Sequence, residues 1–263
     1  MGVRQAARRI GLLEVVGRVT LRRLEEIGSA AALVLRLLGA LVRLRWEVRE
    51  TIRQMDRAGV GSVPIVLLTG AFSGMVLAFQ TSRQLLALGG EAFVGGLVTV
   101  SIAREAGPVF TAVTVAGRVG AGFAAELGTM AVTEQVDALT VMATDPVAYL
   151  VVPRVLALGL MLPVLVLLAN LVGYLGGYAV AVLIGVPSGV YLNSVRQFLD
   201  LDDVTKGLLK AIAFGLAIGI VACTKGLRAC GGAEGVGHAT TSSVVTAIVF
   251  ILVLNYFLDL LLF

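Results

Sequence analysis

An all-α integral membrane protein is the fold class that this sequence predicts, and three observations support it. Hydrophobic residues make up 58% of the 263 residues, and the mean hydropathy is +0.96, whereas a soluble domain contains about 45–50% apolar residues. Several stretches approach the roughly 20 apolar residues that a helix needs to cross a bilayer. These stretches are continuous, whereas the strands of a β-barrel would alternate in hydrophobicity.

Residues 59–263 are expected to form one transmembrane domain. The second span of this domain contains Pro108, which lacks an amide hydrogen, so a kink or local break is expected there. The third span is longer than the bilayer needs, which predicts a tilted helix or an end outside the membrane. The five expected spans cover residues 60–82, 92–117, 153–184, 206–227 and 242–263.

Residues 1–58 are expected to form a separate interfacial region. In residues 3–27, apolar positions recur at three- and four-residue steps among arginines, which predicts an amphipathic helix in the membrane interface or an ordinary cytoplasmic helix. Residues 28–44 are too short for a span and carry Arg36, so an interfacial or re-entrant segment is expected. Residues 45–58 mix Arg and Glu and predict a cytoplasmic helix or link.

Orientation follows from the basic residues near the span ends. The N-terminus and residues 43–57 are rich in arginine and belong in the cytoplasm. The acidic loop 186–205 suits the opposite side and is expected to form a short surface helix. An expected loop at 118–150 is acidic and fits this orientation poorly, whereas the glycine-rich stretch 226–241 is read as a cytoplasmic turn before the last span.

Pairs of glycines four residues apart recur in the apolar stretches. Small residues at this spacing let membrane helices approach closely, although glycine is also simply common in such helices. The three pairs for which close helix contacts are expected are Gly70/Gly74, Gly173/Gly177 and Gly215/Gly219.

The most unusual feature is a polar island in residues 101–146 of this very apolar chain. A charge at the centre of a bilayer costs roughly 2.5 kcal/mol or more, so charges at that depth must face one another or water. Arg104 and Glu105 are adjacent within the second span, and Lys210 lies in the fourth. These three charges are interpreted either as part of a transport path or as a structural ion cluster.

The sequence offers no catalytic or metal-binding motif. A phosphate-binding loop is absent, so the chain is not expected to hydrolyse ATP or to be an enzyme. His238 is the only histidine, and a single histidine cannot build the usual zinc site. Cys223 and Cys230 resemble neither a disulfide framework nor a metal site. No cofactor, metal or nucleic-acid partner is expected.

A short amphipathic helix is expected between spans two and three. Thr133 can cap it through its hydroxyl, and Glu134 suits its first turn. The pair Asp145–Pro146 ends it, because the residue before proline avoids helical geometry. This helix either docks in a groove of a soluble partner or folds back on the chain's own spans. Its candidate docking residues are Thr133, Glu134, Gln135, Val136, Asp137, Leu139 and Met142.

Several ordered motifs together resemble one family. They are A-R-E-x-G-P (103–108), A-G-R-x-G (116–120), A-E-L-G-T-M-x-V-T-E-Q-x-D-A-L (125–139), D-P (145–146), P-R (153–154) and G-V-G-x-A-T-T-x-x-V-V (235–245). Through these motifs the chain resembles the MlaE/YrbE permease family. The resemblance spans nearly all of the chain and is weakest in residues 1–50.

This resemblance implies the membrane subunit of an ABC transporter that moves phospholipids or related lipids across the cell envelope. It implies a homodimer in the bacterial inner membrane, a cytoplasmic ABC ATPase dimer, an MCE-domain protein on the outer face and, often, a STAS-domain protein. The family's coupling helix corresponds to residues 133–142. The alternative from another class is a secondary carrier or channel that works without an ATPase.

The resemblance also implies a lipid pocket lined by spans one, two and four at the dimer axis. Its residues would be Gln80, Leu85 and Leu88 nearer the outer side, with Arg104, Glu105 and Lys210 deeper. Some relatives carry an aromatic residue near the position of Leu88, which this chain lacks.

Overall fold

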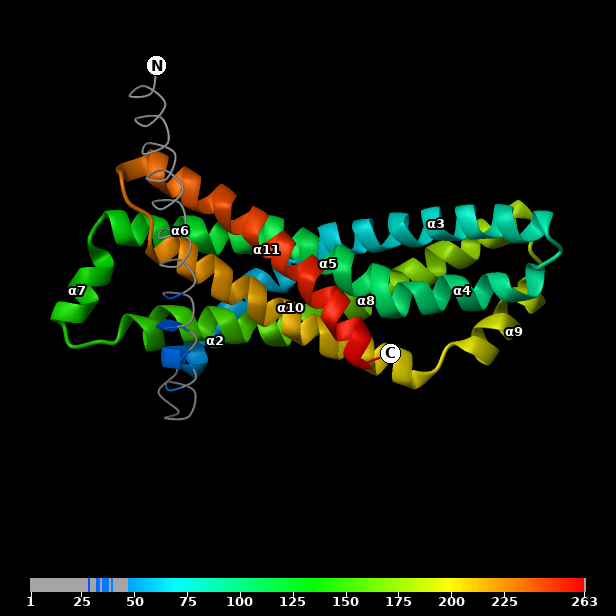
Figure 1. Ribbon diagram of the computed structural model, residues 1–263, viewed down its shortest axis with the longest axis horizontal. Helices are drawn as coiled ribbons and strands as arrows, with labels where there is room; N and C mark the ends of the chain where they lie inside the picture. Colours follow the sequence, from blue (N-terminus) through cyan, green and yellow to red (C-terminus); the bar gives the residue numbers. More distant parts are fainter. Residues whose placement is uncertain (1–27, 29–31, 34, 38, 40–46, 263) are drawn as a thin grey trace, which may run out of the picture.

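The computed structural model describes residues 28, 32–33, 35–37, 39 and 47–262. The expected amphipathic helix at residues 3–27 lies outside the described residues. Figure 1 shows an elongated bundle of helices that run mostly along its long axis, with the C-terminus near mid-length. The described residues contain no strand, which confirms the all-α prediction.

Ten helices carry labels in the described chain. They are α2 (Val48–Ala58), α3 (Val63–Ala87), α4 (Val94–Ser101), α5 (Gly107–Val115), α6 (Ala121–Val132), α7 (Gln135–Val141), α8 (Val152–Ile184), α9 (Ser188–Phe198), α10 (Leu201–Leu227) and α11 (Gly232–Leu262). Short turns join several of these end to end: the 3₁₀ turns η1 (Val60–Ser62) and η2 (Glu91–Phe93), and the π turns η3 (Ile102–Ala106), η4 (Ala116–Gly120) and η5 (Val147–Val151).

Five continuous helical segments are long and apolar enough to cross a membrane within the described residues, as the sequence predicted. Their boundaries differ from the expected ones. The segments are Val48–Ala87, Glu91–Val132, Val147–Ile184, Leu201–Leu227 and Gly232–Leu262.

Two expected loops are largely helical instead. The expected loop 118–150 was wrong because the second helix continues to Val132, leaving only the connection around α7. The expected turn at 226–241 was wrong because α11 begins at Gly232 and packs along α6. In both cases helix packing stabilises small residues that would favour a loop if exposed: Gly128, for example, lies against Val236.

The second membrane-crossing segment, Glu91–Val132, is irregular next to Pro108, as the sequence predicted, but its helix is not interrupted. The π turn η3 directly precedes α5, in which Pro108 occupies the first turn. A π turn inserts one extra residue into a helix, so it shifts the backbone that the proline ring would otherwise hit.

Helix α8 lies at the centre, packed against α2, α3, α5 and α10. The predicted glycine contacts are confirmed at its two main crossings. A Cβ on Gly70 would lie 2.7 Å from the carbonyl oxygen of Ala169, and one on Gly74 would clash with the backbone of Gly173. A Cβ on Gly215 would likewise clash with the backbone of Leu158. These helices can pack this closely only because the glycines lack side chains.

The short helix expected in loop 186–205 is confirmed as α9. It is not a free surface helix, because Tyr191 and Ser194 are buried against α4. The Ser194 hydroxyl accepts a hydrogen bond from the Gly96 amide at 2.9 Å.

Candidate functional site

Lys210 is the centre of the candidate site. Its side chain is 0% exposed, although α10 runs through the apolar part of the bundle. The ammonium lies 2.7 Å from Glu105 Oε1 and 2.7 Å from Asp259 Oδ1, and it donates to the backbone oxygen of Arg104 at 2.8 Å. An ammonium has three donors, so these three acceptors match its capacity.

The proline in the second span explains one of these bonds. Pro108 has no amide hydrogen for the carbonyl four residues earlier, which belongs to Arg104. A backbone carbonyl buried without a partner is costly. Lys210 supplies the missing donor, so the irregular turn and the buried lysine stabilise each other.

Two residues of α11 complete this cluster. Asn255 and Asp259 are one helical turn apart, and the Asn255 amide donates to Glu105 Oε2 at 2.7 Å and to Asp259 Oδ2 at 3.1 Å. It therefore bridges the two carboxylates that share Lys210. Sequence reasoning missed both residues, although their four-residue spacing in an otherwise apolar helix was a visible signal.

Arg104 does not face the lysine cluster with its side chain. Its guanidinium pairs with Asp203 near the start of α10, at 2.6 Å from Nη2 and 2.8 Å from Nε. Asp203 is buried and also closes the capping box of α10 with Asp200. Adjacent residues in a helix point about 100° apart, so Arg104 and Glu105 reach different partners.

The whole cluster has one open side. Two cations and three carboxylates give it a formal charge of −1, and the side chains of Glu105 and Asp259 are 45% and 30% exposed. Exposed charged atoms at this depth need water or a polar ligand. The cluster can therefore present the carboxylates of Glu105 and Asp259 to a polar group beside an apolar surface.

The other expected pocket residues lie further along α3. Gly173 faces both Gly70 and the Ile102 side chain, so the level of the cluster on α3 is near Gly70–Gly74. Gln80 is six residues beyond Gly74, roughly 9 Å along the helix axis, and Leu88 is at the far end of α3 and 82% exposed. Leu85 packs partly against the core of that end. These three do not contact the charge cluster in any bond that the structure shows.

The expected coupling helix is present as α7 but is organised differently. Thr133 does not cap it, because its hydroxyl bonds back to Thr129 O at 2.8 Å in α6. Glu134 takes the N-cap position with a left-handed backbone (φ 59°) and makes no side-chain cap. Val136 and Leu139 pack against the core of the bundle. For these two residues the alternative, a helix folded back on its own spans, is the arrangement observed.

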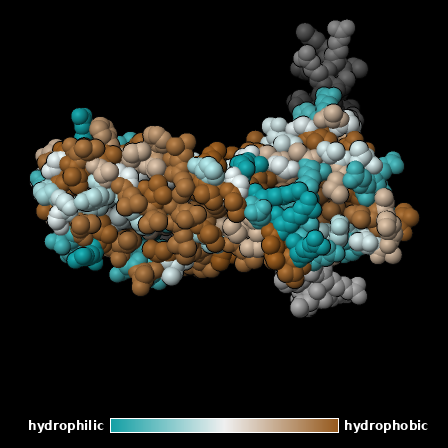
Figure 2. Space-filling model, turned by 180° about the vertical axis from the view of Figure 1, so that it is seen from behind, coloured by the Kyte–Doolittle hydropathy of each residue, from teal (hydrophilic) through white to brown (hydrophobic). Residues whose placement is uncertain are grey.

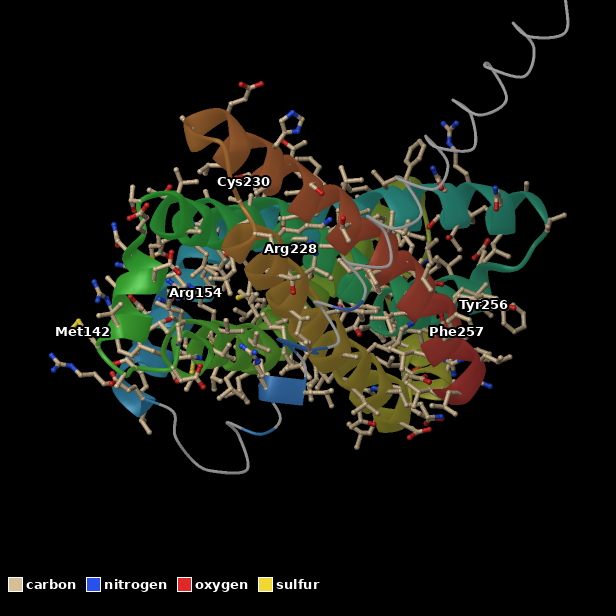
Figure 3. All side chains as sticks on the ribbon, turned by 60° about the vertical axis from the view of Figure 1, so that its left-hand side comes forward. Met142, Arg154, Arg228, Cys230, Tyr256 and Phe257 are labelled. Atoms are coloured by element: carbon tan, nitrogen blue, oxygen red, sulfur yellow. The ribbon has the colours of Figure 1, made fainter. Side chains whose placement is uncertain are left out.

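The end of α7 is nevertheless free. Val141 and Met142 are 88% and 75% exposed, and Figure 3 shows Met142 at the tip of the molecule, pointing away from the bundle. Gln135 and Asp137 are also exposed.

The described residues hold no group of His, Cys, Asp and Glu that could bind a metal ion. Among them, Cys223 is buried and Cys230 is exposed, and neither forms a disulfide.

Five membrane-crossing helices around a buried lysine cluster define a multi-pass membrane protein. The chain belongs to the MlaE permease family, whose model, "Permease MlaE", matches residues 51–261. A probable ABC transporter permease protein of Synechocystis is 47% identical over 216 residues, covering 82% of each chain. One of Rickettsia typhi is 40% identical over 255 residues, covering 97% of this chain and 98% of the relative.

A third relative comes from Arabidopsis thaliana. The chloroplastic protein TRIGALACTOSYLDIACYLGLYCEROL 1 is 38% identical over 231 residues, covering 88% of this chain and 65% of that protein. These comparisons confirm the family that the motifs indicated. The chain is thus an ABC transporter permease, a transport subunit rather than an enzyme, and such permeases imply an ATPase partner.

Proposed function

We propose that this permease moves phospholipids or related lipids across the cell envelope. The observation that carries the proposal is the arrangement of α11 beside the charge cluster. Asn255 and Asp259 face Glu105 and Lys210, while Tyr256 and Phe257 on the same two turns are 67% and 60% exposed. Figure 3 shows these two rings projecting from the outer side of α11.

An amphipathic substrate fits this arrangement. A lipid headgroup needs hydrogen-bonding and charged partners, and its tails need an apolar wall. One helix supplies both here, because Asn255 and Asp259 place polar groups on its inner side near the C-terminal end, while its exposed side is apolar. The exposed apolar residues on α11 are Val245, Val249, Phe250, Leu252, Val253, Tyr256, Phe257, Leu260 and Leu261.

The name of the Arabidopsis relative supports the same substrate class, because trigalactosyldiacylglycerol is a glycolipid. Family membership favours an ATP-driven transporter over a secondary carrier.

The mechanism we propose is alternating exposure of a lipid cavity between two copies of the chain. Movement of a cytoplasmic ATPase dimer would be transmitted to the permease through residues 133–142. From there the second helix runs without a break back to the cluster: Glu105 and Val132 are 27 residues apart, roughly 40 Å along the axis. A shift of α6 would therefore be passed to Glu105 along this continuous segment, through η4 and α5.

The remaining partners belong to the same proposal. They are an MCE-domain protein on the outer face and, in some assemblies, a STAS-domain protein. The membrane proposed is the bacterial inner membrane, with α2 and α7 on the cytoplasmic side. The arginines of α2 support this orientation by the positive-inside rule.

Lipid transfer between proteoliposomes tests the proposal. The chain is reconstituted with its ATPase, and ATP-dependent transfer of fluorescent phospholipids with different headgroups is measured. We expect Asn255→Ala to reduce transfer and change headgroup preference, whereas Asn193→Ala on the exposed surface of α9 should have no effect. Absence of ATP-dependent lipid transfer by the assembled wild-type complex would refute the lipid assignment.

A further inference from the structure

A separate site with an exposed arginine lies where the first membrane-crossing segment changes from polar to apolar. Helix α2 carries five charged residues, whereas α3 carries none before Arg83. The turn η1 joins the two helices and ends at the fully buried Ser62. Arg118, in the π turn η4 of the second helix, reaches this junction from the side.

Ser62 fixes the position of the Arg118 guanidinium. The serine hydroxyl donates to Ala58 O at 2.7 Å and accepts from Arg118 Nη1 at 2.7 Å. The guanidinium lies over Gly61, where a Cβ would be 2.9 Å from Nη2. Arg118 stays exposed, and Ser62 is the only polar partner that the described residues give it. An arginine has five N–H donors, so most of the N–H groups of the Arg118 guanidinium are available to a ligand.

The charges around Arg118 leave a positive surplus. Arg154 is buried and binds Glu126 Oε2 at 3.0 Å, so these two charges largely cancel. Arg57 reaches the same carboxylate only at 3.8 Å and is half exposed. Arg57 and Arg154 therefore share the Glu126 carboxylate, while no ion pair between described residues joins Arg118 to an acidic side chain. Elsewhere on α2 the opposite charges are nearly balanced: Arg49 and Arg53 against Glu50 and Asp56.

The surface beside Arg118 consists of exposed apolar side chains and of glycines, which have no side chain. Beyond Gly61 the exposed face of α3 continues through Ile65, Leu68 and Phe72. Gly117 and Gly122 flank Arg118, and added Cβ atoms there would meet nothing within 4 Å. Figure 2 shows a hydrophilic patch next to the broad hydrophobic surface, toward the end of the molecule that carries α7.

We propose that Arg118 and Arg57 bind the phosphate of an anionic phospholipid from the cytoplasmic leaflet, with an acyl chain lying along Leu68 and Phe72. Guanidinium groups match phosphate in a bidentate manner, and arginines at a membrane surface attract anionic lipids. The site is separate from the lysine cluster, because Glu105 and Arg118 are 13 residues apart on one helix, roughly 20 Å. It does not depend on which molecule the permease transports.

The test is lipid binding by the purified full-length chain, without an ATPase and without transport. Native mass spectrometry counts phosphatidylglycerol and phosphatidylcholine retained from mixed micelles. We expect wild-type protein to prefer phosphatidylglycerol, and Arg118→Gln and Arg57→Gln each to weaken this binding about five-fold, since one surface arginine contributes about that factor. Arg118→Lys keeps the charge and should retain part of the preference.

The matched control is Arg83→Gln, at the other end of α3, where the arginine lies over the Phe79 ring. It should leave binding unchanged. An equal loss in Arg83→Gln, or equal retention of both lipids by wild-type protein, overturns the proposal. Displacement by millimolar inorganic phosphate would show a free-phosphate site and overturn the lipid assignment. A loss of dimer in Arg118→Gln on size exclusion would assign the surface to self-association instead.

Discussion

Removal of the Lys210 ammonium is the sharpest test of the buried cluster. In Lys210→Met, Glu105 and Asp259 lose their shared cation but remain next to each other, bridged by Asn255. Breaking a buried ion pair from one side costs about 3–5 kcal/mol. Because both carboxylates are partly exposed, solvent screens part of their repulsion, and we expect the lower end, about 3 kcal/mol.

This cost is measurable as a change in thermal unfolding. For a chain of this size, 1 kcal/mol corresponds to about 2–4 °C, so the unfolding midpoint in detergent should fall by roughly 6–12 °C. The matched control is Lys206→Met, one turn earlier on α10. Lys206 pairs with the exposed Asp202 at 2.7 Å, and such a surface pair contributes only about 0.3–0.5 kcal/mol.

A second variant separates charge from packing. The triple change Lys210→Met, Glu105→Gln, Asp259→Asn removes all three charges and should recover more than half of the lost stability, because no uncompensated charge remains. Two results would refute this reasoning: Lys210→Met unfolding within about 1 °C of wild type, or a triple variant that is no more stable than the single one. Either would show that the lysine does not stabilise the fold by neutralising Glu105 and Asp259.

Three further outcomes are expected. Gly74→Leu should lower stability by about 1–3 kcal/mol because its side chain meets the Gly173 backbone, whereas Gly122→Leu should be neutral; equal thermal midpoints for both would contradict close α3–α8 packing. Met142→Asp should abolish copurification of the ATPase without changing stability, whereas Val136→Asp should destabilise the permease itself; retained ATPase binding in Met142→Asp would exclude the tip of α7 as a docking point. Asp203→Asn should cost about 1–3 kcal/mol through the lost ion pair and cap, measured by circular dichroism, and an unchanged melting curve would show that neither contributes.

Much of the architecture was predictable from local composition. The five apolar stretches, the irregularity at Pro108 and the close approach at the glycine pairs all follow from residue type and spacing, and the structure has each of them. The ordered motifs also indicated the family correctly. The errors fell at segment ends, where glycine-rich and charged residues suggested loops at 118–150 and 226–241 that are in part helical, in α6 and at the start of α11.

Those errors have a common physical cause. Arg118 and Glu126 can stay in a helix because Ser62 and Arg154, far away in the sequence, bind them. A single sequence shows that a charge is present but not whether a partner will satisfy it. Packing against a neighbouring helix then outweighs the local preference for a turn.

The sequence by itself determined that the chain is a membrane protein, which stretches within residues 47–262 are apolar enough to cross the bilayer, and that charges lie among them. Only the tertiary structure decided which charges meet. Arg104 and Glu105 are neighbours in the chain yet bind different partners, Asp203 and the Lys210–Asn255 group. Side-chain direction depends on helical phase, and a π turn changes that phase by one residue. These ion pairs join helices that are far apart in the sequence. No local sequence pattern could therefore specify which residues pair.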